Sequence, residues 1–367
     1  MKPRFSSTRN QETTTYLHFL TYLEKNYSRS GVILSECYLR QIPLVFTKLI
    51  PPYLNTVKQL LDSHTSNKGI FPIFIVMSPA QLIAPLLRCF TRKPIILDAG
   101  WTLTESAIYR AKGKRFRLGV GVKNYLIDFF AMHMSSLVLL ESEKQRRYAR
   151  SRFLLPLRKS ARIFTGFNED LYSEIAFEKP MELIELKKFK KNSFIFFRGK
   201  YNSESGLERI AELTLKLENL NFVIASDIDA EKFKFSKNTC LIPRNLSEGE
   251  IKWLYVNSAI CLGQLSKSKR LLNTIPHKAF EAGYFGKPYV SLSTGAVREL
   301  FPLNSQAIFV ESNELDALST IISNMFHSPL ELEAIGLECR ARYTTVASQS
   351  TLFYEFMALC GRFSPEN

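Results

Sequence analysis

The sequence lacks the features that would place the protein across a membrane or around a metal cluster. No uninterrupted apolar run reaches the roughly 18 residues that a membrane-spanning helix needs. The basic N-terminus, residues 1–7, is not followed by the apolar core of a signal peptide. The six cysteines lie far apart without a C-x-x-C pair, which argues against a zinc site or a disulfide framework. Most of them lie in apolar runs, as expected of core residues in a reducing cytoplasm.

Signatures of cofactor and P-loop chemistry are also missing. The five histidines show no ligand spacing. No G-x-x-x-x-G-K-[ST] loop is present to hold a nucleotide triphosphate. We therefore expect a protein with no metal site and no bound cofactor.

Short apolar runs recur along the whole chain and are separated by segments with helical spacing. This alternation of strands and helices is typical of parallel, doubly wound sheets. Near the N-terminus, residues 11–27 have helical spacing and residues 31–35 form a short apolar run typical of a strand. Further strands are predicted at 70–77, 94–98, 136–141 and 161–165, and then at 193–198, 221–225, 239–242, 259–263, 289–293 and 307–310.

At 367 residues the chain is long enough for two domains of ordinary size. We predict an α/β fold of two Rossmann-like, doubly wound domains with a ligand-binding cleft between them. The N-terminal domain spans 1–177 and the C-terminal domain spans 193–367. The charged segment 178–192 has no clear core face and is interpreted as the linker. The last helix is expected to pack back on the N-terminal domain.

Basic residues are concentrated in the first half of the chain. Residues 1–180 contain 27 Lys and Arg against 13 Asp and Glu, whereas residues 181–367 contain 22 against 21. The first half therefore carries nearly all of the net charge of +15. Such a charge predicts an anionic partner, either a membrane surface or a phosphorylated acceptor. Nucleic acid is not favoured, because no recognised binding motif accompanies the charge.

The segment 273–288 lies between two apolar runs and predicts a loop and a short helix between two strands. Pro276 suits the first helical turn, and Gly286 suits a helix stop. Lys278 and Glu281 share one face near the helix N-terminus. A carboxylate there can accept hydrogen bonds from sugar hydroxyls, and the free N–H groups of the first turn can hold a phosphate. The segment therefore predicts a site for a nucleotide diphosphate.

The pattern P-x-K-x-F-E-A-x-x-x-G-K-P in this segment resembles the donor-site helix of the group 1 glycosyltransferases, which have the GT-B fold. The resemblance implies that Glu281 binds the donor ribose and that Thr274 and Lys278 lie against its diphosphate. Family members often carry another Glu eight positions earlier, near the donor sugar. That position is Asn273 here, so the resemblance makes Asn273 the candidate beside the reacting sugar. The alternative is an ordinary crossover helix with a surface ion pair.

The run after the strand 193–198 resembles the family's G-R…K-G-L-E segment, whose Arg and Lys neutralise the donor diphosphate. Lys200 stands in the place of the Arg, and Ser205 stands in the place of the Lys. Arg198, two residues before Lys200, is interpreted as a partial replacement for the missing Lys. A strand that ends in exposed basic residues is the alternative.

Two turns of the second half also resemble family motifs. Thr294 and Gly295, with Glu299 downstream, resemble the small-residue turn beside the donor. A helix N-cap by Thr294 is an equally good interpretation and does not exclude the first. Ser247 and Glu250 resemble the turn where the family's nucleotide base packs, although a capping box is favoured there.

In the first half, Asp98 ends a predicted strand. Family members often carry an Asp and a His at this place, but no His follows here. The resemblance makes Asp98 a candidate catalytic residue, and Asp98 and Glu105 candidates for holding the acceptor. A helix cap and a solvated side chain are the respective alternatives. The Gly-rich loop that usually opens the family's first domain is not found.

These motifs predict a hexosyltransferase-type glycosyltransferase of glycan or polysaccharide biosynthesis. It would use a nucleotide-diphosphate sugar without a metal and, by family likeness, retain the anomeric configuration. The predicted partners are the donor, a glycan or lipid-linked acceptor and an anionic membrane surface, with no nucleic acid. We expect the protein in the cytoplasm, either free or on the inner face of the membrane. The alternatives are a non-catalytic GT-B domain that only binds, which Asn273 and Ser205 favour, and a GT-B-like sugar-nucleotide epimerase.

Overall fold

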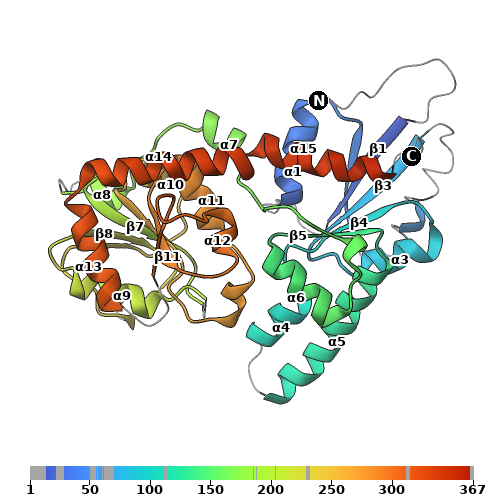
Figure 1. The fold of residues 1–367 in the computed structure, drawn as a ribbon, viewed down its shortest axis with the longest axis horizontal. Helices are drawn as coiled ribbons and strands as arrows, with labels where there is room; N and C mark the ends of the chain where they lie inside the picture. Colours follow the sequence, from blue (N-terminus) through green and yellow to red (C-terminus); the bar gives the residue numbers. More distant parts are fainter. Residues whose placement is uncertain are drawn as a thin grey trace. The chain divides into compact units, whose positions relative to one another are not determined.

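The computed structural model divides into two compact units (Figure 1). The first unit is formed by residues of 1–141, 146–163 and 352–367, and the second by 142–145 and 164–351. The structure describes residues 14–363 apart from 22–28, 50–54, 56, 60, 62–69, 111–113, 185, 187, 203, 229–231 and 311–314.

The first unit contains a six-stranded sheet in which every described pair of strands is parallel. Its strand order is β2-β1-β3-β4-β5-β6, so the direction of winding reverses between β1 and β3. Ligands of such sheets bind outside the carboxyl ends of the strands at this reversal. The strands are β1 (Thr14–Thr21), β2 (Leu44–Lys48), β3 (Ile70–Met77), β4 (Ile95–Asp98), β5 (Leu137–Leu140) and β6 (Ser160–Arg162).

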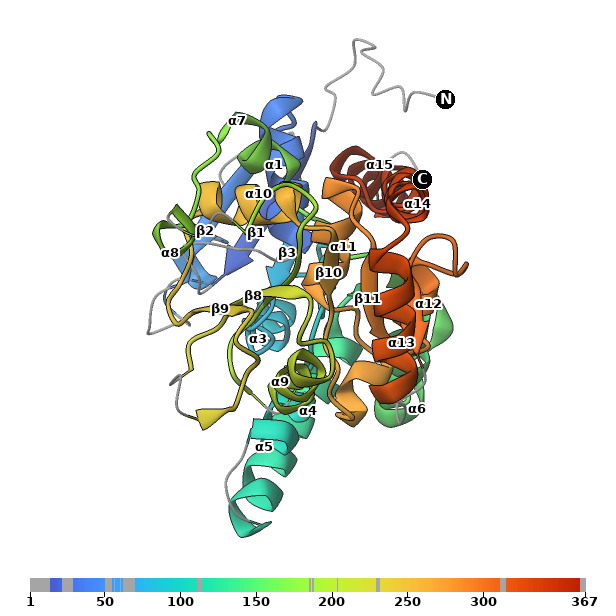
Figure 2. The same cartoon turned by 90° about the vertical axis from the view of Figure 1, so that its left-hand side faces the viewer.

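Helices cover both faces of this sheet, with α1 on one side and α3 and α5 on the other (Figures 1 and 2). Side chains of α3 and α5 join those of β3, β4 and β5 in one buried apolar cluster. The helices are α1 (Arg29–Leu39), α3 (Ile83–Phe90), α4 (Leu103–Arg110), α5 (Lys114–Met134), α6 (Glu143–Phe153) and α15 (Gln349–Cys360), and both α6 and α15 contain residues of the two units.

The second unit repeats this arrangement. Its described strands are also paired in parallel, in the order β12-β11-β10-β7-β8-β9, and the winding reverses between β7 and β10. The strands are β7 (Phe194–Arg198), β8 (Asn221–Ala225), β9 (Thr239–Ile242), β10 (Ile260–Leu262), β11 (Tyr289–Leu292) and β12 (Ile308–Val310).

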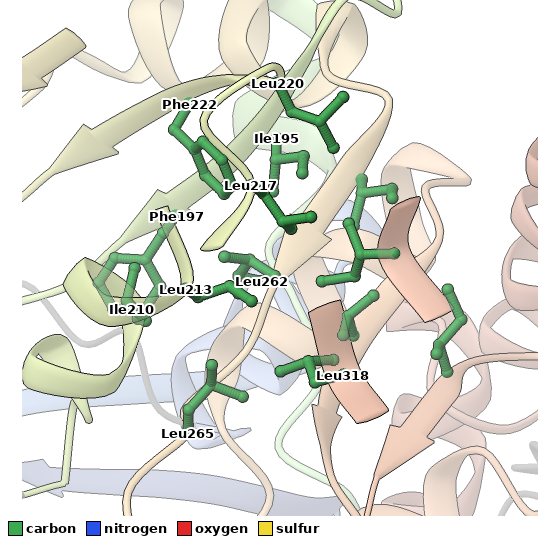
Figure 3. Close-up of a cluster of buried hydrophobic side chains, with 14 of the residues drawn as sticks. Ile195, Phe197, Ile210, Leu213, Leu217, Leu220, Phe222, Leu262, Leu265 and Leu318 are labelled. Carbon is green, nitrogen blue, oxygen red and sulfur yellow. The ribbon is translucent and has the colours of Figure 1, made fainter. Parts of the chain in front are cut away.

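Helices α10 and α11 lie on one side of this second sheet, and α9 and α13 lie on the other (Figures 1 and 2). Figure 3 shows Ile210 and Leu213 of α9 and Leu318 of α13 in the buried cluster that covers this face. The helices of the unit are α7 (Glu169–Glu174), α8 (Met181–Ile184), α9 (Leu207–Lys216), α10 (Glu248–Asn257), α11 (His277–Phe285), α12 (Val297–Leu300), α13 (Leu315–Phe326) and α14 (Pro329–Val346).

The predicted α/β class with two doubly wound sheets is confirmed, but two elements near the N-terminus are exchanged. The helix predicted over 11–27 is instead the strand β1, and the strand predicted over 31–35 belongs to the helix α1. Leu17, Phe19 and Leu20 are all buried, because the strand is paired on both edges and covered on both faces. Because both faces of the strand are buried, Leu17, Phe19 and Leu20 do not follow the strict alternation of a strand exposed on one face, and their spacing also fits a helix.

The segment 178–192 is part of the second unit. Leu183 and Phe189 are buried, and the Phe189 ring meets Phe194 edge-on with 5.9 Å between the centroids. Arg244 also binds both Glu182 and Glu250. The predicted linker is therefore packed on the sheet, and the chain passes between the units after Ile163. Residues 352–367, which include most of α15, belong to the first unit.

None of the helices within the described residues combines the length and the apolar character that crossing a membrane requires.

Candidate functional site

The candidate site lies where the second sheet reverses its winding. β7 ends at Arg198, and the neighbouring strand β10 ends at Leu262. Chains leaving the carboxyl ends of two neighbouring strands in opposite directions leave room above the sheet edge, where ligands of doubly wound folds bind. The loop after β10 leads directly into α11, which brings the helix N-terminus to this edge.

The segment 273–288 folds as predicted into a loop and a short helix. Pro276 is the N-cap residue of α11, and Gly286 ends the helix in a left-handed conformation with φ of 63°. An L-residue at this position would be strained, because the left-handed region brings its Cβ close to the backbone. The helix stop predicted at Gly286 is therefore confirmed. The first N–H groups of α11 are left without intrahelical acceptors, as at every helix N-terminus.

Glu281 and Arg198 form the centre of the site. The Glu281 side chain is completely buried, and its two oxygens accept from Nε and Nη2 of Arg198 in a two-pronged ion pair. The same oxygens contact the hydroxyl of Tyr255 and, at 2.8 Å, Nδ1 of His277. A carboxylate offers about four positions for hydrogen bonds, so these contacts occupy it fully.

Charge pairing dominates the ionisation of this carboxyl group. Burial alone would raise the pKa of Glu281, but the Arg198 charge and the contact with His277 hold this pKa well below its usual range. Burial raises the pKa of Tyr255, and the negative charge of Glu281 raises it further. The network therefore contains a carboxylate, a guanidinium and a neutral phenol at neutral pH.

Arg198 is partly accessible to a ligand. Its side chain is 28% exposed, although Glu281 beneath it has no exposure. The two nitrogens that bind Glu281 fix the plane of the guanidinium, so the remaining nitrogen, Nη1, is held in a set direction. A fork oriented in this way is well suited to a phosphate oxygen.

Lys278 approaches the same sheet edge from α11. Its Nζ lies 4.9 Å from the centre of the Phe197 ring, and a Cβ on Gly199 would come within 3.0 Å of it. Burial lowers the pKa of Lys278 to about 8, and the positive charge of Arg198 contributes to this shift. Two cationic side chains thus converge where the sequence predicted a diphosphate. A bound anion would favour the protonated form of Lys278.

The loop after β7 is only partly available to a ligand. Lys200 is exposed. Ser205 is buried, and both its N–H and its hydroxyl donate to Asn202, at 3.0 and 2.8 Å. Gly206 has φ of 68°, and a Cβ there would lie 2.4 Å from the backbone nitrogen of Ser266. Ser205 therefore shapes the loop, and the close approach of two backbones at Gly206 joins it to the loop after β10.

Asn273 and Thr274 lie in the loop before α11. Thr274 is nearly buried, and its hydroxyl donates to the carbonyl of Arg270 at 3.2 Å. The backbone carbonyl of Asn273 accepts from the hydroxyl of Ser142 at 2.6 Å. Arg270 in turn binds both carboxylate oxygens of Glu204 at 2.8 Å, which ties this loop to the one after β7. The roles predicted for Asn273 and Thr274 stay predictions.

The turn after β11 is held by contacts of Thr294 and Glu299. The hydroxyl of Thr294 accepts from the N–H of Val297, the first residue of α12, at 3.3 Å, although the N-cap position of that helix is occupied by Ala296. Glu299 accepts from the backbone N–H groups of Glu143 and Lys144, which belong to the same unit. A Cβ on Gly295 would lie 2.5 Å from Cε of Lys144. Contact of Thr294, Gly295 and Glu299 with a donor stays a prediction.

Asp98 belongs to the first unit, at the end of β4. It is buried, and its Oδ1 lies 3.1 Å from Nη2 of Arg29. Glu105 is buried as well, and its carboxylate and N–H both contact the hydroxyl of Thr102, at 3.0 and 3.2 Å. This exchange is a capping interaction, so Glu105 is not a solvated side chain. The catalytic role of Asp98 stays a prediction.

Sequence reasoning did not identify the aromatic surroundings of Glu281. Tyr255 contacts it from α10, and His277 contacts it from one turn earlier on α11. Phe167 lies beyond His277 with its ring centroid at 6.0 Å, and Tyr172 lies 4.6 Å from Phe167. The four-residue spacing of His277 and Glu281 is a signal that the sequence contains. Tyr255 and Phe167 have no local signal. The capping box predicted for Ser247 and Glu250 is confirmed.

Comparison with solved structures identifies the fold. The sucrose-phosphate synthase of Thermosynechococcus elongatus matches with a TM-score of 0.68 and 10% identity, over 95% of this chain and 98% of that chain. Alr3699/HepE of Anabaena, solved in complex with UDP, matches with a TM-score of 0.64 and 13% identity, over 95% and 100%. A glycosyltransferase of Rickettsia africae matches with 0.64 and 14% identity, over 97% and 100%. No family model and no curated protein sequence matches this chain.

The matches extend over nearly the full length of this chain and of the matched chains. The chain therefore has the two-domain α/β fold of the GT-B glycosyltransferases, as predicted. At 10–14% identity the likeness concerns the fold, and the activity must be argued from the site.

We expect Glu281→Gln to remove an acid-sensitive part of the protein's stability. The pKa of Glu281 is lower in the folded than in the unfolded chain, where it is near 4.5. Its contribution to stability is therefore fully present above the unfolded pKa and is lost progressively as the pH falls from that value through the lower pKa of the folded state. Thermal melts should show the variant less stable than the wild type at about pH 7, with the gap narrowing below about pH 5.

Glu331→Gln is the matched control, because Glu331 is exposed on α14 of the same unit. This variant should melt with the wild type throughout. A Glu281→Gln gap that stays constant with pH would contradict the assignment of Glu281 as the carboxylate that balances Arg198.

Proposed function

We propose that the protein is a glycosyltransferase that takes its sugar from a nucleotide diphosphate, with UDP as the first nucleotide to test. The observation that carries the proposal is the convergence of Arg198 and Lys278 at the reversal point of the second sheet. The fold supports it, since Alr3699/HepE matches over nearly its whole length and was solved with UDP and with UDP-glucose.

In the proposed reaction the leaving diphosphate is stabilised by positive charge. Nη1 of Arg198, Nζ of Lys278 and the exposed Lys200 supply the charge from side chains. The first N–H groups of α11, beside Thr274, supply a further partial positive charge. Fixed donors and charges aimed at the leaving group are a large contribution to catalysis, because they need no reorganisation during the reaction.

Glu281 has a more specific place in this scheme than its predicted contact with ribose. Its oxygens are occupied by Arg198, Tyr255 and His277. A ribose hydroxyl can reach the carboxylate only by replacing one of these partners. Arg198 is the partner with a second anion to bind, so we propose that Glu281 orients Arg198 and accepts the ribose when Arg198 turns towards the diphosphate.

Transfer of a hexose with retention, in glycan or polysaccharide synthesis, is the finer form of the proposal. Asn273 would contact the sugar from the loop before α11, and Asp98 would act from the first unit. The alternative is a binding protein without catalysis. The buried Ser205 favours this alternative, because it stands where the resembled family carries a phosphate-binding Lys. Its hydroxyl here bonds to the carbonyl of Asn202 within the loop. Nucleotide binding with no hydrolysis or transfer to any acceptor would support that alternative.

Calorimetry with UDP tests the donor site. Arg198→Gln and Lys278→Met should each weaken binding by about tenfold or more, because each removes a charge-assisted contact. Wild-type affinity should also decline above the pKa of Lys278, about 8, since the protonated ammonium is the form that holds the diphosphate. Lys278→Arg, which keeps its charge, should remove this decline.

Lys216→Met is the control, because Lys216, the last residue of α9, already pairs with the exposed Asp316 of α13. Its affinity for UDP should equal that of the wild type. Absence of UDP binding to the folded wild type, together with absence of binding by other nucleotide diphosphates, would reject the proposed function.

We further propose that transfer needs no divalent metal, because Arg198 and Lys278 supply the positive charge. Turnover should persist when a chelator is present and should not rise when magnesium or manganese is added. A D-x-D pair, Asp227 and Asp229, follows β8; Asp227 accepts from the N–H of Tyr201 at 2.8 Å, and Asp229 lies outside the described residues. Loss of turnover with chelator that Asp227→Asn reproduces would overturn the proposal.

The first unit supports a location at an anionic membrane surface on the cytoplasmic side. Val122, Leu126 and Phe130 are each about half exposed and recur every fourth residue along α5, so they form one apolar stripe. Lys123 is exposed beside them. Apolar side chains flanked by cations suit the boundary between lipid headgroups and acyl chains. Such a location would favour a lipid-linked acceptor.

Co-sedimentation with liposomes tests this surface. The wild type should pellet with anionic but not with neutral vesicles, and salt should release it because the attraction is screened. Leu126→Asp should abolish pelleting, whereas Leu330→Asp, at the 83% exposed Leu330 of the second unit, should not change it. Equal recovery in the supernatant with both kinds of vesicle would reject membrane attachment.

A further inference from the structure

The first unit has its own cluster of buried polar side chains close to the reversal point of its sheet. The winding reverses between β1 and β3, and β4 lies next to β3. Arg29, Ser78, Gln81 and Asp98 are gathered beyond the carboxyl ends of β3 and β4, and all four are buried. This is the edge at which doubly wound sheets bind their ligands.

Arg29 has hydrogen-bonding capacity that the folded chain does not use. Its side chain is only 1% exposed, and its Nη2 lies 3.1 Å from Oδ1 of Asp98. Nevertheless Nε, Nη1 and Nη2 have no hydrogen-bond partner among the described residues. A guanidinium carries five N–H donors, and buried donors are nearly always paired with protein, water or a ligand. A buried, unpartnered guanidinium therefore indicates a missing acceptor.

Gln81 provides a second unpartnered group, which is an acceptor, whereas those of Arg29 are donors. Its Nε2 donates to the carbonyl of Trp101 at 3.1 Å and to the hydroxyl of Ser78 at 3.2 Å. Because a carbonyl only accepts, these contacts settle which end of the amide is the nitrogen. The amide oxygen, Oε1, is then buried without a partner within the described part of the chain. It calls for a hydroxyl or N–H donor.

The two unpartnered side chains, Arg29 and Gln81, are linked by a short chain of contacts. Arg29 meets the carboxylate of Asp98, whose backbone carbonyl accepts from the hydroxyl of Ser78 at 2.7 Å, and Ser78 accepts from Gln81. Arg162 and Glu355 also lie within electrostatic range of this cluster, because the charges of Arg162 and Arg29 both lower the pKa of Glu355, against the stronger upward effect of its burial. The cluster thus contains both positive and negative charges, and neither sign is present alone.

The unused donors and the unused acceptor define the chemistry of a ligand. Arg29 calls for a group with several acceptor oxygens and no hydrogen to clash, which describes a carboxylate or a phosphate. Gln81 calls for a neighbouring hydroxyl. We propose that this site binds the acceptor and selects a carbohydrate that carries an oxyanion, with the oxyanion on Arg29 and a hydroxyl on Oε1 of Gln81. The acceptor role rests on the proposed transferase function, whereas the ligand chemistry does not.

Binding to the full-length protein tests this site apart from activity. The probes are glucose 6-phosphate, glucuronate and neutral glucose, titrated by calorimetry into the wild type. Glucose 6-phosphate or glucuronate should bind about tenfold or more tightly than glucose, because a charge-assisted bond replaces a neutral one. Preference for one of the two anions identifies a phosphate ester or a sugar acid as the natural group.

Arg29→Met should abolish the preference and leave the affinity for UDP unchanged. Arg40→Gln is the control, because Arg40 directly follows the end of the same helix, α1, is partly exposed and pairs with Glu36. It should keep the preference. If Arg29→Met does not fold, Arg29→Lys is used in its place, and its ratio of anion affinity to glucose affinity should also fall. Lysine keeps the positive charge beside Asp98 but lacks the planar fork of the guanidinium.

Equal affinity of the wild type for glucose and for both anions would overturn the proposal, and so would a folded Arg29 variant that keeps the preference. UDP binding separates this outcome from failure of the proposed function. A protein that binds UDP without an oxyanion preference rejects only the acceptor inference. A protein that shows the preference but binds no nucleotide rejects only the transferase.

Discussion

The ion pair between Arg198 and Glu281 is the interaction on which the rest of the candidate site depends. It joins the end of β7 to the first turns of α11, and Glu281 is completely buried at its inner end. Breaking such a pair from one side is costly, because it leaves a buried charge without compensation. Lys278 and His277 lie on the same short helix. Their positions over the sheet edge are therefore set by the contact that anchors α11 to β7.

This pair also determines which ligand chemistry the site can accept. A carboxylate with all its hydrogen-bonding positions filled has nothing to offer a sugar, whereas the exposed edge of Arg198 has donors to offer an anion. An incoming diphosphate can compete with Glu281 for Arg198, and the same exchange makes Glu281 available to hydroxyl groups. Binding of the two halves of a nucleotide would then be coupled through one guanidinium. That coupling requires the arginine at the end of β7 and is independent of the lysine that Ser205 replaces.

The sequence predicted the strands of the second unit well and the tertiary partners of the site poorly, for physical reasons. β8 and β9 were predicted to the residue, because short buried runs between polar loops leave a clear local pattern. Lys278 and Glu281 were recognisable because they share one helix face. The partner of Glu281 lies 83 residues away on β7, and only the parallel pairing of β7 with β10 brings it there. At the N-terminus, β1 is buried on both faces, and the spacing of Tyr16, Leu17, Phe19 and Leu20 also fits one face of a helix, so the local pattern did not distinguish the two.

Each of the two sheets has an ion pair between an arginine and a carboxylate beyond the carboxyl ends of its strands, but the two pairs are in different states. At the reversal of the second sheet, Glu281 binds Arg198 with two hydrogen bonds and has every acceptor position occupied. Near the reversal of the first sheet, beyond the end of β4, Arg29 lies against Asp98 without a hydrogen bond from any of its side-chain nitrogens within the described chain. A saturated pair can admit a ligand only by exchange, whereas an unsaturated pair is completed by one. The two sites therefore differ in how a ligand enters them, because the buried carboxylate is already saturated in one, whereas a buried guanidinium still requires an acceptor in the other.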